Sequence, residues 1–268
     1  MRNLTLHYGA PRLLGPGEGE DIGGRVRIKC ARNELTLTET VGPGSTEPHI
    51  HLHHSDAFRV LEGEFAVQAG EGELALGPGD FALAPPGLVH RYRTSGARWL
   101  NIHTPDRGFA EYLRSGSGFD DHPPPEDGGR PATDALLLGN GEGELLDLGP
   151  GTQGRVKVAS AEVTVIEFEL GPGSPGPPPH RHAGITDSFY VLDGTLTVTL
   201  GEERLQASAG SYAFVPPGNV HTVSNPGAER VRFLNVTAPG GLERYLRELA
   251  VDPSDFPAIA ARHDVLPA

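Results

Sequence analysis

Pro48-His49-Ile50-His51-Leu52-His53-His54-Ser55-Asp56-Ala57-Phe58 is the stretch that decides how the chain is organised. Its pattern returns as Pro179-His180-Arg181-His182, followed by Asp187-Ser188-Phe189. Each shared His and Asp lies 131 positions after its counterpart, and His90 is matched by His221 at the same interval. Four polar residues therefore recur in fixed register within two otherwise different halves.

Other features of the two halves repeat as well. The glycine-rich run Leu14–Glu20 is echoed by Leu138–Glu144, and Gly42–Ser45 is echoed by Gly171–Ser174. Repeats of this length indicate duplication of a whole domain rather than a short solenoid period. The segment between the halves is rich in proline and charge, which is typical of a linker. We therefore expect domains at 1–119 and 134–268, joined by a linker at 120–133.

The local patterns predict an all-β protein. Glu34–Val41 and Glu162–Leu170 alternate apolar and polar residues, which is the period of a half-buried strand. Asp193-Gly194 between two apolar runs is a strong hairpin signal, because glycine accepts the positive φ of the turn. Many short strands at this spacing favour a sandwich or barrel. Apolar residues at helical spacing predict a short helix at the end of each half: Phe109, Tyr112 and Leu113, then Leu242, Tyr245, Leu246 and Leu249.

Composition excludes several classes of function. The 268 residues suffice for two cores, and a net charge of −13 without a basic cluster argues against nucleic acid as a partner. The single Cys30 cannot form an internal disulfide, which suits a reducing compartment. No stretch approaches the roughly 20 apolar residues of a membrane span, and no apolar leader follows Met1. We therefore expect a cytoplasmic protein without a membrane partner.

The repeated histidines predict a metal centre in each half. Alternate residues of a strand share a face, so His49 and His51 point the same way, as do His180 and His182. A barrel interior does not tolerate several unpaired imidazoles, and a divalent metal resolves this by coordinating their neutral nitrogens. Three imidazoles and one carboxylate would fill four positions of an octahedron, leaving about two for water or substrate.

These residues resemble the two motifs of the cupin superfamily. The first half reads His49-x-His51-x4-Asp56-x6-Gly63, then Gly79-x5-Pro85-x-Gly87-x2-His90. The second half reads His180-x-His182-x4-Asp187-x6-Gly194, then Gly210-x5-Pro216-x-Gly218-x2-His221-x3-Asn225. The resemblance covers most of the chain and implies a bicupin: two tandem cupin-type (jelly-roll, double-stranded β-helix) barrels, each followed by a short helix. The metal ligands that it implies are His49, His51, Asp56 and His90, and His180, His182, Asp187 and His221.

The chain departs from the family pattern at a few positions. The family usually has Glu where this chain has Asp56 and Asp187, so each Asp could bind the metal, act through water or serve as a base. Thr94 stands where the second half has Asn225, and His103 aligns with Thr237. We expect His53 and His54 to be exposed in a loop, although strand alternation would let His53 replace a motif ligand.

The resemblance to quercetinase-like bicupins implies a metal-dependent dioxygenase. Its substrate would be a small aromatic or polyphenol-like molecule, used together with dioxygen, and its metal would be Fe, Mn, Ni, Co, Cu or Zn. Asp56 and Asp187 are the catalytic candidates, as acceptors of a substrate hydroxyl proton. Two alternatives stay open: a non-redox isomerase or decarboxylase of a small sugar or acid, and a small-molecule-binding protein without catalysis. The paired halves allow a monomer or a homodimer.

Overall fold

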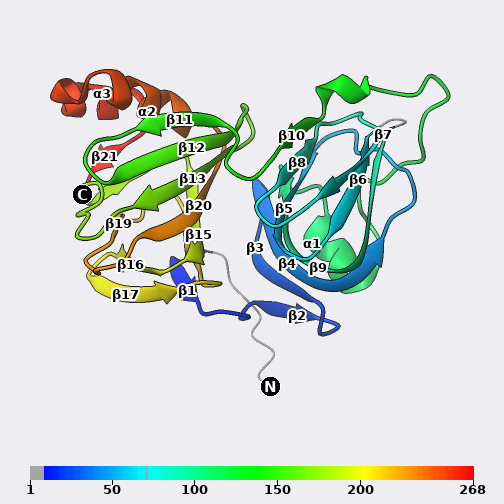
Figure 1. The fold of residues 1–268 in the computed structure, drawn as a ribbon, viewed down its shortest axis with the longest axis horizontal. Helices are drawn as coiled ribbons and strands as arrows, with labels where there is room; N and C mark the ends of the chain where they lie inside the picture. Colours follow the sequence, from blue (N-terminus) through cyan, green and yellow to red (C-terminus); the bar gives the residue numbers. More distant parts are fainter. Residues whose placement is uncertain (1–8, 70–71) are drawn as a thin grey trace. The chain divides into compact units, whose positions relative to one another are not determined.

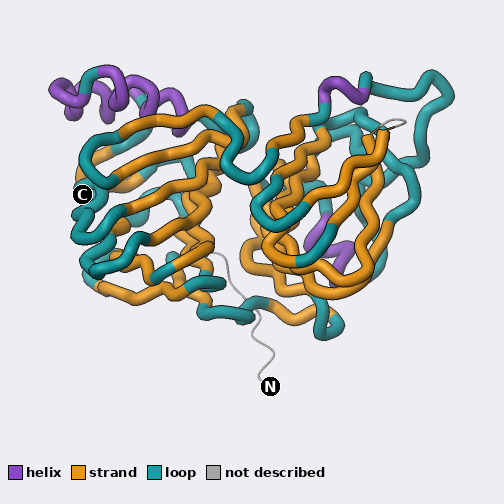
Figure 2. The backbone as a smooth tube through the Cα atoms, in the orientation of Figure 1, coloured by secondary structure: helices purple, strands orange, loops and turns teal. Residues whose placement is uncertain are grey.

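The computed structural model describes residues 9–69 and 72–268 and confirms the all-β architecture (Figures 1 and 2). By their contacts the residues divide into two compact units. Residues 19–142 form the first unit, and residues 143–268 form the second together with the described residues up to Glu18. Each unit is described below by itself. Among the described residues, no helix has the length and apolarity needed to cross a membrane.

The first unit is built around one long strand. β9 (His90–Thr104) pairs with β4 along one edge, and along the other with β5 near its end and β6 near its start, so a single strand joins both layers of the unit. The sheet order is β10-β8-β5-β9-β4-β3-β2, with β6 and β7 beside β9. The remaining strands are β2 (Glu20–Ile22), β3 (Val26–Arg32), β4 (Leu35–Ser45), β5 (Ser55–Glu62), β6 (Phe65–Ala69), β7 (Gly72–Leu76), β8 (Phe81–Ala84) and β10 (Leu136–Leu138).

The second unit has the same plan with two separate sheets. One sheet has the order β1-β18-β15-β20-β13-β12-β11, and the other has the order β17-β16-β19-β14-β21. Two strands, β19 and β20, stand where the first unit has only β9. Their bounds are β1 (Arg12–Leu14), β11 (Glu144–Asp147), β12 (Thr152–Ala159), β13 (Thr164–Leu170), β14 (His180–Arg181), β15 (Thr186–Asp193), β16 (Thr195–Leu200), β17 (Glu203–Ser208), β18 (Tyr212–Val215), β19 (His221–Ser224), β20 (Val231–Ala238) and β21 (Leu266–Pro267).

Asn225 explains the break between β19 and β20. Its side-chain amide donates to the carbonyls of Leu170, Gly171 and Glu229 at 2.8–3.0 Å and so holds the chain in a turn. Thr94, at the matching place in the first unit, lies inside the continuous strand β9 and donates to the Glu64 carbonyl instead. The strand is thus interrupted at Asn225, which precedes Pro226, and is continuous at Thr94.

Each unit takes its edge strand from the glycine-rich segment that precedes the other half. β1 pairs with β18 in the second unit, and β10 pairs with β8 in the first. Both strands end in the same turn, in which Glu18 and Glu142 accept the backbone N–H of Gly15 and Gly139 at 2.7 Å. Residues 134–138 therefore belong to the first unit by their contacts, although they follow the proline-rich segment.

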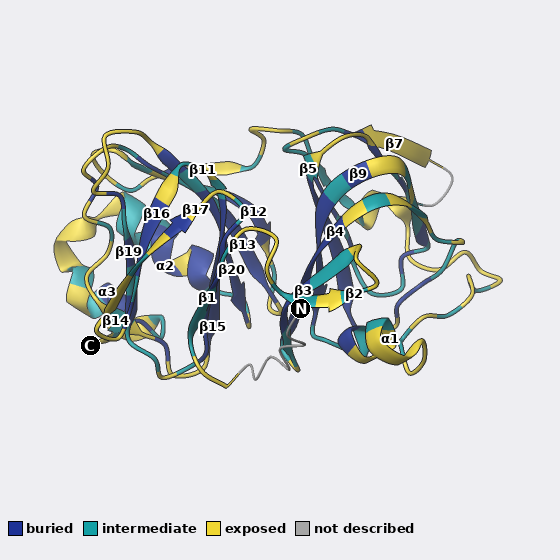
Figure 3. Ribbon diagram, turned by 90° about the horizontal axis from the view of Figure 1, so that it is seen from below, coloured by how far each residue is buried: buried dark blue, intermediate teal, exposed yellow. Residues whose placement is uncertain are grey.

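Short helices follow each set of strands, as expected. α1 (Phe109–Ser115) closes the first unit, and α2 (Leu242–Val251) follows β20 in the second. α3 (Phe256–Arg262) is an addition that the apolar spacing did not predict. Figure 3 shows buried residues concentrated where the layers of each unit face one another, with exposed residues on the turns.

Candidate metal centres

The second unit brings all four of its motif side chains together. His180 lies on β14, His182 follows it, Asp187 lies on β15 and His221 begins β19. His180 and His221 are direct cross-strand partners. One ligand atom from each of the four residues lies within 4.8 Å of all the others. The spacing of the sequence motif is thus converted into a single cluster by strand pairing.

The orientation of the imidazoles suits metal binding. In every motif histidine, Nδ1 lies within hydrogen-bond distance of a backbone carbonyl oxygen. The pairs are His49–Glu47 at 2.7 Å, His51–Asp120 at 2.7 Å, His90–Leu88 at 2.9 Å, His180–Pro178 at 2.9 Å, His182–Asp264 at 2.7 Å and His221–Asn219 at 3.1 Å. Because a carbonyl can only accept, Nδ1 must carry the proton, and the neutral ring presents a free lone pair at Nε2.

The carboxylate of Asp187 is oriented in the same way. Its Oδ1 accepts a hydrogen bond from the amide of Asn235, which also donates to the Ser188 carbonyl at 3.1 Å. Its Oδ2 lies 3.1 Å from His221 Nε2 and 3.6 Å from His182 Nε2. Two ligand atoms adjacent on one ion, each about 2.1 Å from it, are about 3 Å apart. Since His182 Nε2 is also buried without a hydrogen-bond partner, the donor set fits a divalent transition metal.

The first unit has a looser version of this cluster. His49, His51 and His90 bring their ring nitrogens within 4.8 Å of one another, and that group does not include Asp56. Asp56 Oδ2 lies 3.6 Å from His90 Nε2 and 3.9 Å from His51 Nε2, while its Oδ1 accepts from the Asn101 amide. The three histidines fit a metal ion, and Asp56 stands farther from them than Asp187 does from its partners.

The extra histidines of the first unit are arranged differently from the expectation. His54, expected in an exposed loop, is fully buried and stacks on His51 with ring centroids 4.1 Å apart, whereas His53 is exposed. The expectation for His54 was wrong, because the chain bends at residues 52–53 and the His54 ring packs on His51 and Phe119. His103 is also buried, and its Nε2 donates to the side-chain oxygen of Asn101 at 2.9 Å.

Burial sets the pKa values of the clustered imidazoles. Desolvation lowers the pKa of His51 to about 2, that of His103 to about 3 and that of His180 to about 4. His182 differs: burial alone would lower its pKa, but contact with Asp187 raises it above the ordinary value. For Asp187, desolvation raises the pKa, yet His182 and His221 together lower it below its ordinary value. The second cluster therefore holds a tightly paired carboxylate and imidazole.

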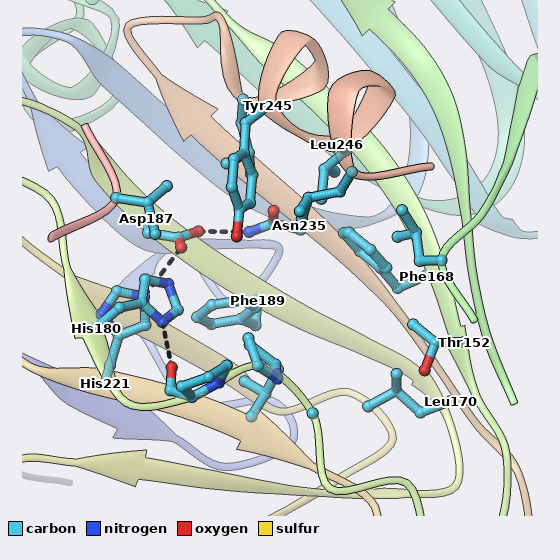
Figure 4. A pocket seen from close by; sticks show the side chains of 18 of the residues that line it. Thr152, Phe168, Leu170, His180, Asp187, Phe189, His221, Asn235, Tyr245 and Leu246 are labelled. Atoms are coloured by element: carbon cyan, nitrogen blue, oxygen red, sulfur yellow. Dashed lines mark hydrogen bonds and ion pairs between the residues drawn. The ribbon is translucent and has the colours of Figure 1, made fainter. Parts of the chain in front are cut away.

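An apolar cavity of about 300 Å³ opens onto the second cluster (Figure 4). Phe168, Phe189 and Phe233 line it from the barrel, and α2 contributes Tyr245, whose ring points from the helix toward Asp187 and Asn235. Among the described residues that line this cavity, none is a lysine or an arginine. The cavity is thus shaped for an uncharged, largely apolar molecule with one end at the histidines.

The cupin domain family model matches this chain twice, at residues 37–103 and 166–237. The chain belongs to the cupin family. Both matched ranges include the motif Asp and the strand that closes the barrel, so the tandem cupin fold expected from the sequence is confirmed. The curated quercetin 2,3-dioxygenase of Bacillus subtilis (strain 168) is 27% identical to this cupin, over 94% of this chain and 90% of its own length.

Solved structures support the same fold. Protein Ylba from E. coli matches with a TM-score of 0.63 at 14% identity, over 87% of this chain and 92% of its own. The oxalate decarboxylase of Lactobacillus farciminis, in complex with formate, matches with a TM-score of 0.55 at 15% identity, over 85% of this chain and 83% of its own. At such identities the likeness shows architecture alone.

Sequence reasoning missed several residues that complete the two clusters. Asn101 and Asn235 make the same pair of hydrogen bonds, to the motif carboxylate and to the carbonyl of the next residue. Their separation differs from 131, because the turn after Asn225 is longer than its counterpart. Realigning the halves on their last strands would have found this pair. Asp120 and Asp264 have no counterpart at the repeat interval and left no such signal, whereas Tyr245 was predicted only as part of the helix at the end of the second half.

Proposed function

We propose that the second unit is the active centre of a metal-dependent oxidoreductase of the dioxygenase type. Its substrate would be a small, uncharged aromatic molecule that carries a hydroxyl group, as in polyphenols. The observation that carries this proposal is the meeting of two features in one place: a complete His3Asp cluster and an apolar cavity of about 300 Å³ lined by aromatic rings. The likeness to a quercetin 2,3-dioxygenase over 94% of the chain supports it.

The cavity favours an aromatic substrate over a small diacid. A volume of about 300 Å³ lies at the lower end of the range of small-molecule sites and suits a small aromatic molecule. A dicarboxylate could place one carboxylate on the metal ion, but the described lining residues include no lysine or arginine to pair with the second. Phe189 and Phe233 offer ring faces and edges to a substrate ring.

We assign roles to the second cluster as follows. His180, His182 and His221 hold the ion through Nε2, and Asp187 ligates through Oδ2 while Asn235 fixes its other oxygen. A divalent transition metal bound there would act as a Lewis acid that makes a coordinated hydroxyl more acidic. With the metal bound, Asp187 would be the group placed to accept the proton of a substrate hydroxyl, and Asn235 would keep its carboxylate oriented. The apolar wall excludes water from the reacting molecule.

Tyr245 is the second polar group available to a substrate. It is buried on α2, lines the cavity and directs its ring toward the Asp187 end. Burial raises the pKa of Tyr245 to about 12, so the phenol stays protonated and can donate a hydrogen bond at all ordinary pH values. We propose that it donates this hydrogen bond to a substrate oxygen beside Asp187.

The first cluster is proposed as a second metal site with His49, His51 and His90 as ligands and Asp56 as the acid beside them. Asp56 stays an ionised carboxylate like Asp187, because His103 and His90 lower its pKa although burial raises it. Its greater distance from His51 and His90 makes direct coordination weaker than at Asp187. The main turnover is assigned to the second unit.

Oxygen consumption tests this proposal. Metal-free protein is loaded separately with Fe²⁺, Mn²⁺, Co²⁺, Ni²⁺, Cu²⁺ and Zn²⁺ and mixed with a panel of flavonols and catechols in an oxygen-electrode cell. Uptake that depends on both metal and substrate is expected, with metal-free protein as the control. Failure of every metal to support uptake would overturn the dioxygenase assignment. Turnover with Zn²⁺ under nitrogen would point to non-redox chemistry instead.

A further inference from the structure

The six motif histidines obtain their Nδ1 acceptors in two ways. Four of them use the carbonyl two residues earlier in the chain, as His180 uses Pro178. His51 and His182 instead use the carbonyls of Asp120 and Asp264, which lie 69 and 82 residues away. The second histidine of each motif is therefore oriented by a remote segment.

The same two aspartates also hold the loop that follows each histidine. The Asp120 Oδ2 atom accepts the backbone N–H of Leu52 at 3.1 Å and of His53 at 2.8 Å. Asp264 accepts the N–H of Ala183 through Oδ1 at 2.7 Å and that of Gly184 through Oδ2 at 2.9 Å. Each aspartate thus binds the ring with its backbone and the next two residues with its side chain.

The two aspartates occupy matching places in the two units. They are 144 positions apart rather than 131, and they lie in dissimilar segments. Asp120 lies in the proline-rich segment after α1, in a stretch where His122 pairs with Ile50. Asp264 lies between α3 and β21, and β21 pairs with β14 beside His180 and Arg181. Ile50 and Arg181 correspond at the repeat interval, and each pairs with the residue two positions after an aspartate. The same set of three hydrogen bonds in both units indicates a shared requirement of the two clusters.

We propose that Asp120 and Asp264 are positioning residues for the metal-binding histidines His51 and His182. Each carbonyl holds its ring in the tautomer that frees Nε2, and each carboxylate anchors the loop so that the ring cannot swing out of the cluster. This inference rests on the metal-binding part of the proposed function and is independent of the reaction catalysed.

The backbone at Asp264 shows why an aspartate stands there. Its φ is +57°, the left-handed region that Asp and Asn tolerate better than other side chains. That conformation belongs to the turn that directs its carbonyl to His182 and its carboxylate to Ala183 and Gly184. The preceding His263 contacts Glu248 of α2 at 2.7 Å, so the same turn is tied to the helix that carries Tyr245. The cavity wall and the metal ligand are thereby joined.

The test uses full-length protein reduced to one centre at a time. His49→Ala leaves the second centre, and His180→Ala leaves the first. Co²⁺ affinity is measured by competition with a chromophoric chelator, together with the visible absorption of bound Co²⁺. In the His49→Ala background, Asp264→Ala is expected to weaken Co²⁺ binding about 10- to 100-fold and to change the absorption spectrum. Asp120→Ala in this background should change neither.

Conservative variants separate positioning from general stability. Asp264→Asn keeps the tolerated φ but loses one of two acceptor oxygens, so its Co²⁺ affinity should fall between those of wild type and Asp264→Ala. Asp120→Asn, in the His180→Ala background, keeps one oxygen that can accept both N–H groups and should bind Co²⁺ within about threefold of its parent. Asp120→Ala in that background should lose about 10- to 100-fold.

The outcomes are decisive in each direction. Unchanged Co²⁺ affinity and spectrum in Asp264→Ala, with the fold intact by circular dichroism, would overturn the proposal. If Asp264→Ala does not fold, Asp264→Asn decides: affinity equal to its parent overturns it, and a graded loss supports it. Graded losses in a protein that consumes no oxygen with any substrate would leave the positioning role standing and remove only the dioxygenase assignment.

Discussion

The two units carry the same ligand pattern but fill their barrels differently. In the first unit, Phe65, Tyr92 and Trp99 pack on one another, with ring centroids 5.1–5.6 Å apart. In the second unit, the residues at these places are Leu196, Val223 and Phe233, by the repeat interval and by strand register. Val223 and Phe233 line the cavity of about 300 Å³. Smaller side chains at the same framework positions leave room for this cavity.

The carboxylates of the two clusters, Asp56 and Asp187, also differ in their surroundings. Asp187 lies 3.1 Å from its nearest ring nitrogen, whereas Asp56 lies 3.4 Å from His103, a residue outside the motif, and 3.6 Å from His90. In the second unit, Thr237 occupies the place of His103 opposite the motif Asp. The first carboxylate is therefore shared with an additional histidine. The two clusters have the same candidate ligands, but the side chains around them differ in volume and in charge.

The largest effect should come from removing one ligand of each cluster in turn. His180→Ala is expected to lower metal-dependent oxygen uptake by at least about 100-fold, because a metal contributes several kcal/mol to the reaction. His49→Ala should retain most of the activity. The two rates are compared with metal content measured on the same samples. Equal losses in both variants would break the assignment of turnover to the second unit.

Copying the first unit's packing into the second should come next in size. Val223→Tyr places a phenol ring where Tyr92 stands in the first unit, and should lower kcat/KM about 10- to 100-fold by filling the cavity. Co²⁺ affinity should stay unchanged, because Val223 is no ligand. Val223→Ile, which adds one methylene, is the matched control. A fully active Val223→Tyr variant would show that substrate binds elsewhere.

Removing the Tyr245 hydroxyl should have a smaller effect. Tyr245→Phe is expected to raise KM about 5- to 10-fold, which is the loss of one hydrogen bond to a bound molecule. The thermal midpoint should change by less than about 2 °C, since the ring and its packing are kept. Steady-state kinetics on the best substrate of the panel provide the measurement. An unchanged KM would place the hydroxyl outside the substrate contact.

Acid should destabilise the metal-free first unit more than the second. Burial lowers the pKa of His49, His51, His54 and His103, so these groups stay neutral in the folded first unit while the unfolded chain binds protons below about pH 6.5. Their contribution to stability is complete above that pH and is lost progressively as pH falls toward the folded values. In the second unit, the pKa of His180 is lowered in the same way, but that of His182 is raised and gives the opposite dependence.

The single tryptophan allows this difference to be measured. Trp99 is buried in the core of the first unit, so its fluorescence reports the unfolding of that unit, whereas circular dichroism reports both. Between pH 7.5 and pH 5, the midpoint from fluorescence should fall on the order of 5 °C more than the midpoint of the second transition. If both unfolding midpoints shifted equally with pH, the two histidine clusters would not differ in burial and ion pairing as described.

Much of the fold and of the ligand set could be predicted from the sequence. Period-two alternation and Asp193-Gly194 gave the strands and hairpins, and the repeat interval gave the eight candidate ligands. These features succeed because they are local or are copied unchanged from one half to the other. His54 failed for the complementary reason, because its burial follows from a bend and from the ring of His51.

The sequence by itself determined the duplication, the strands and the side chains that point into each barrel. It also determined the orientation of four motif histidines, whose carbonyl partners lie two residues earlier in the turn or loop that leads to them. Only the tertiary structure decided the other two, through Asp120 and Asp264, and only it decided that an apolar cavity lies beside the second cluster. The physical reason is the sequence distance over which each interaction acts. Backbone periodicity acts over a few residues, whereas core packing and hydrogen bonds between remote residues form only when the chain has folded.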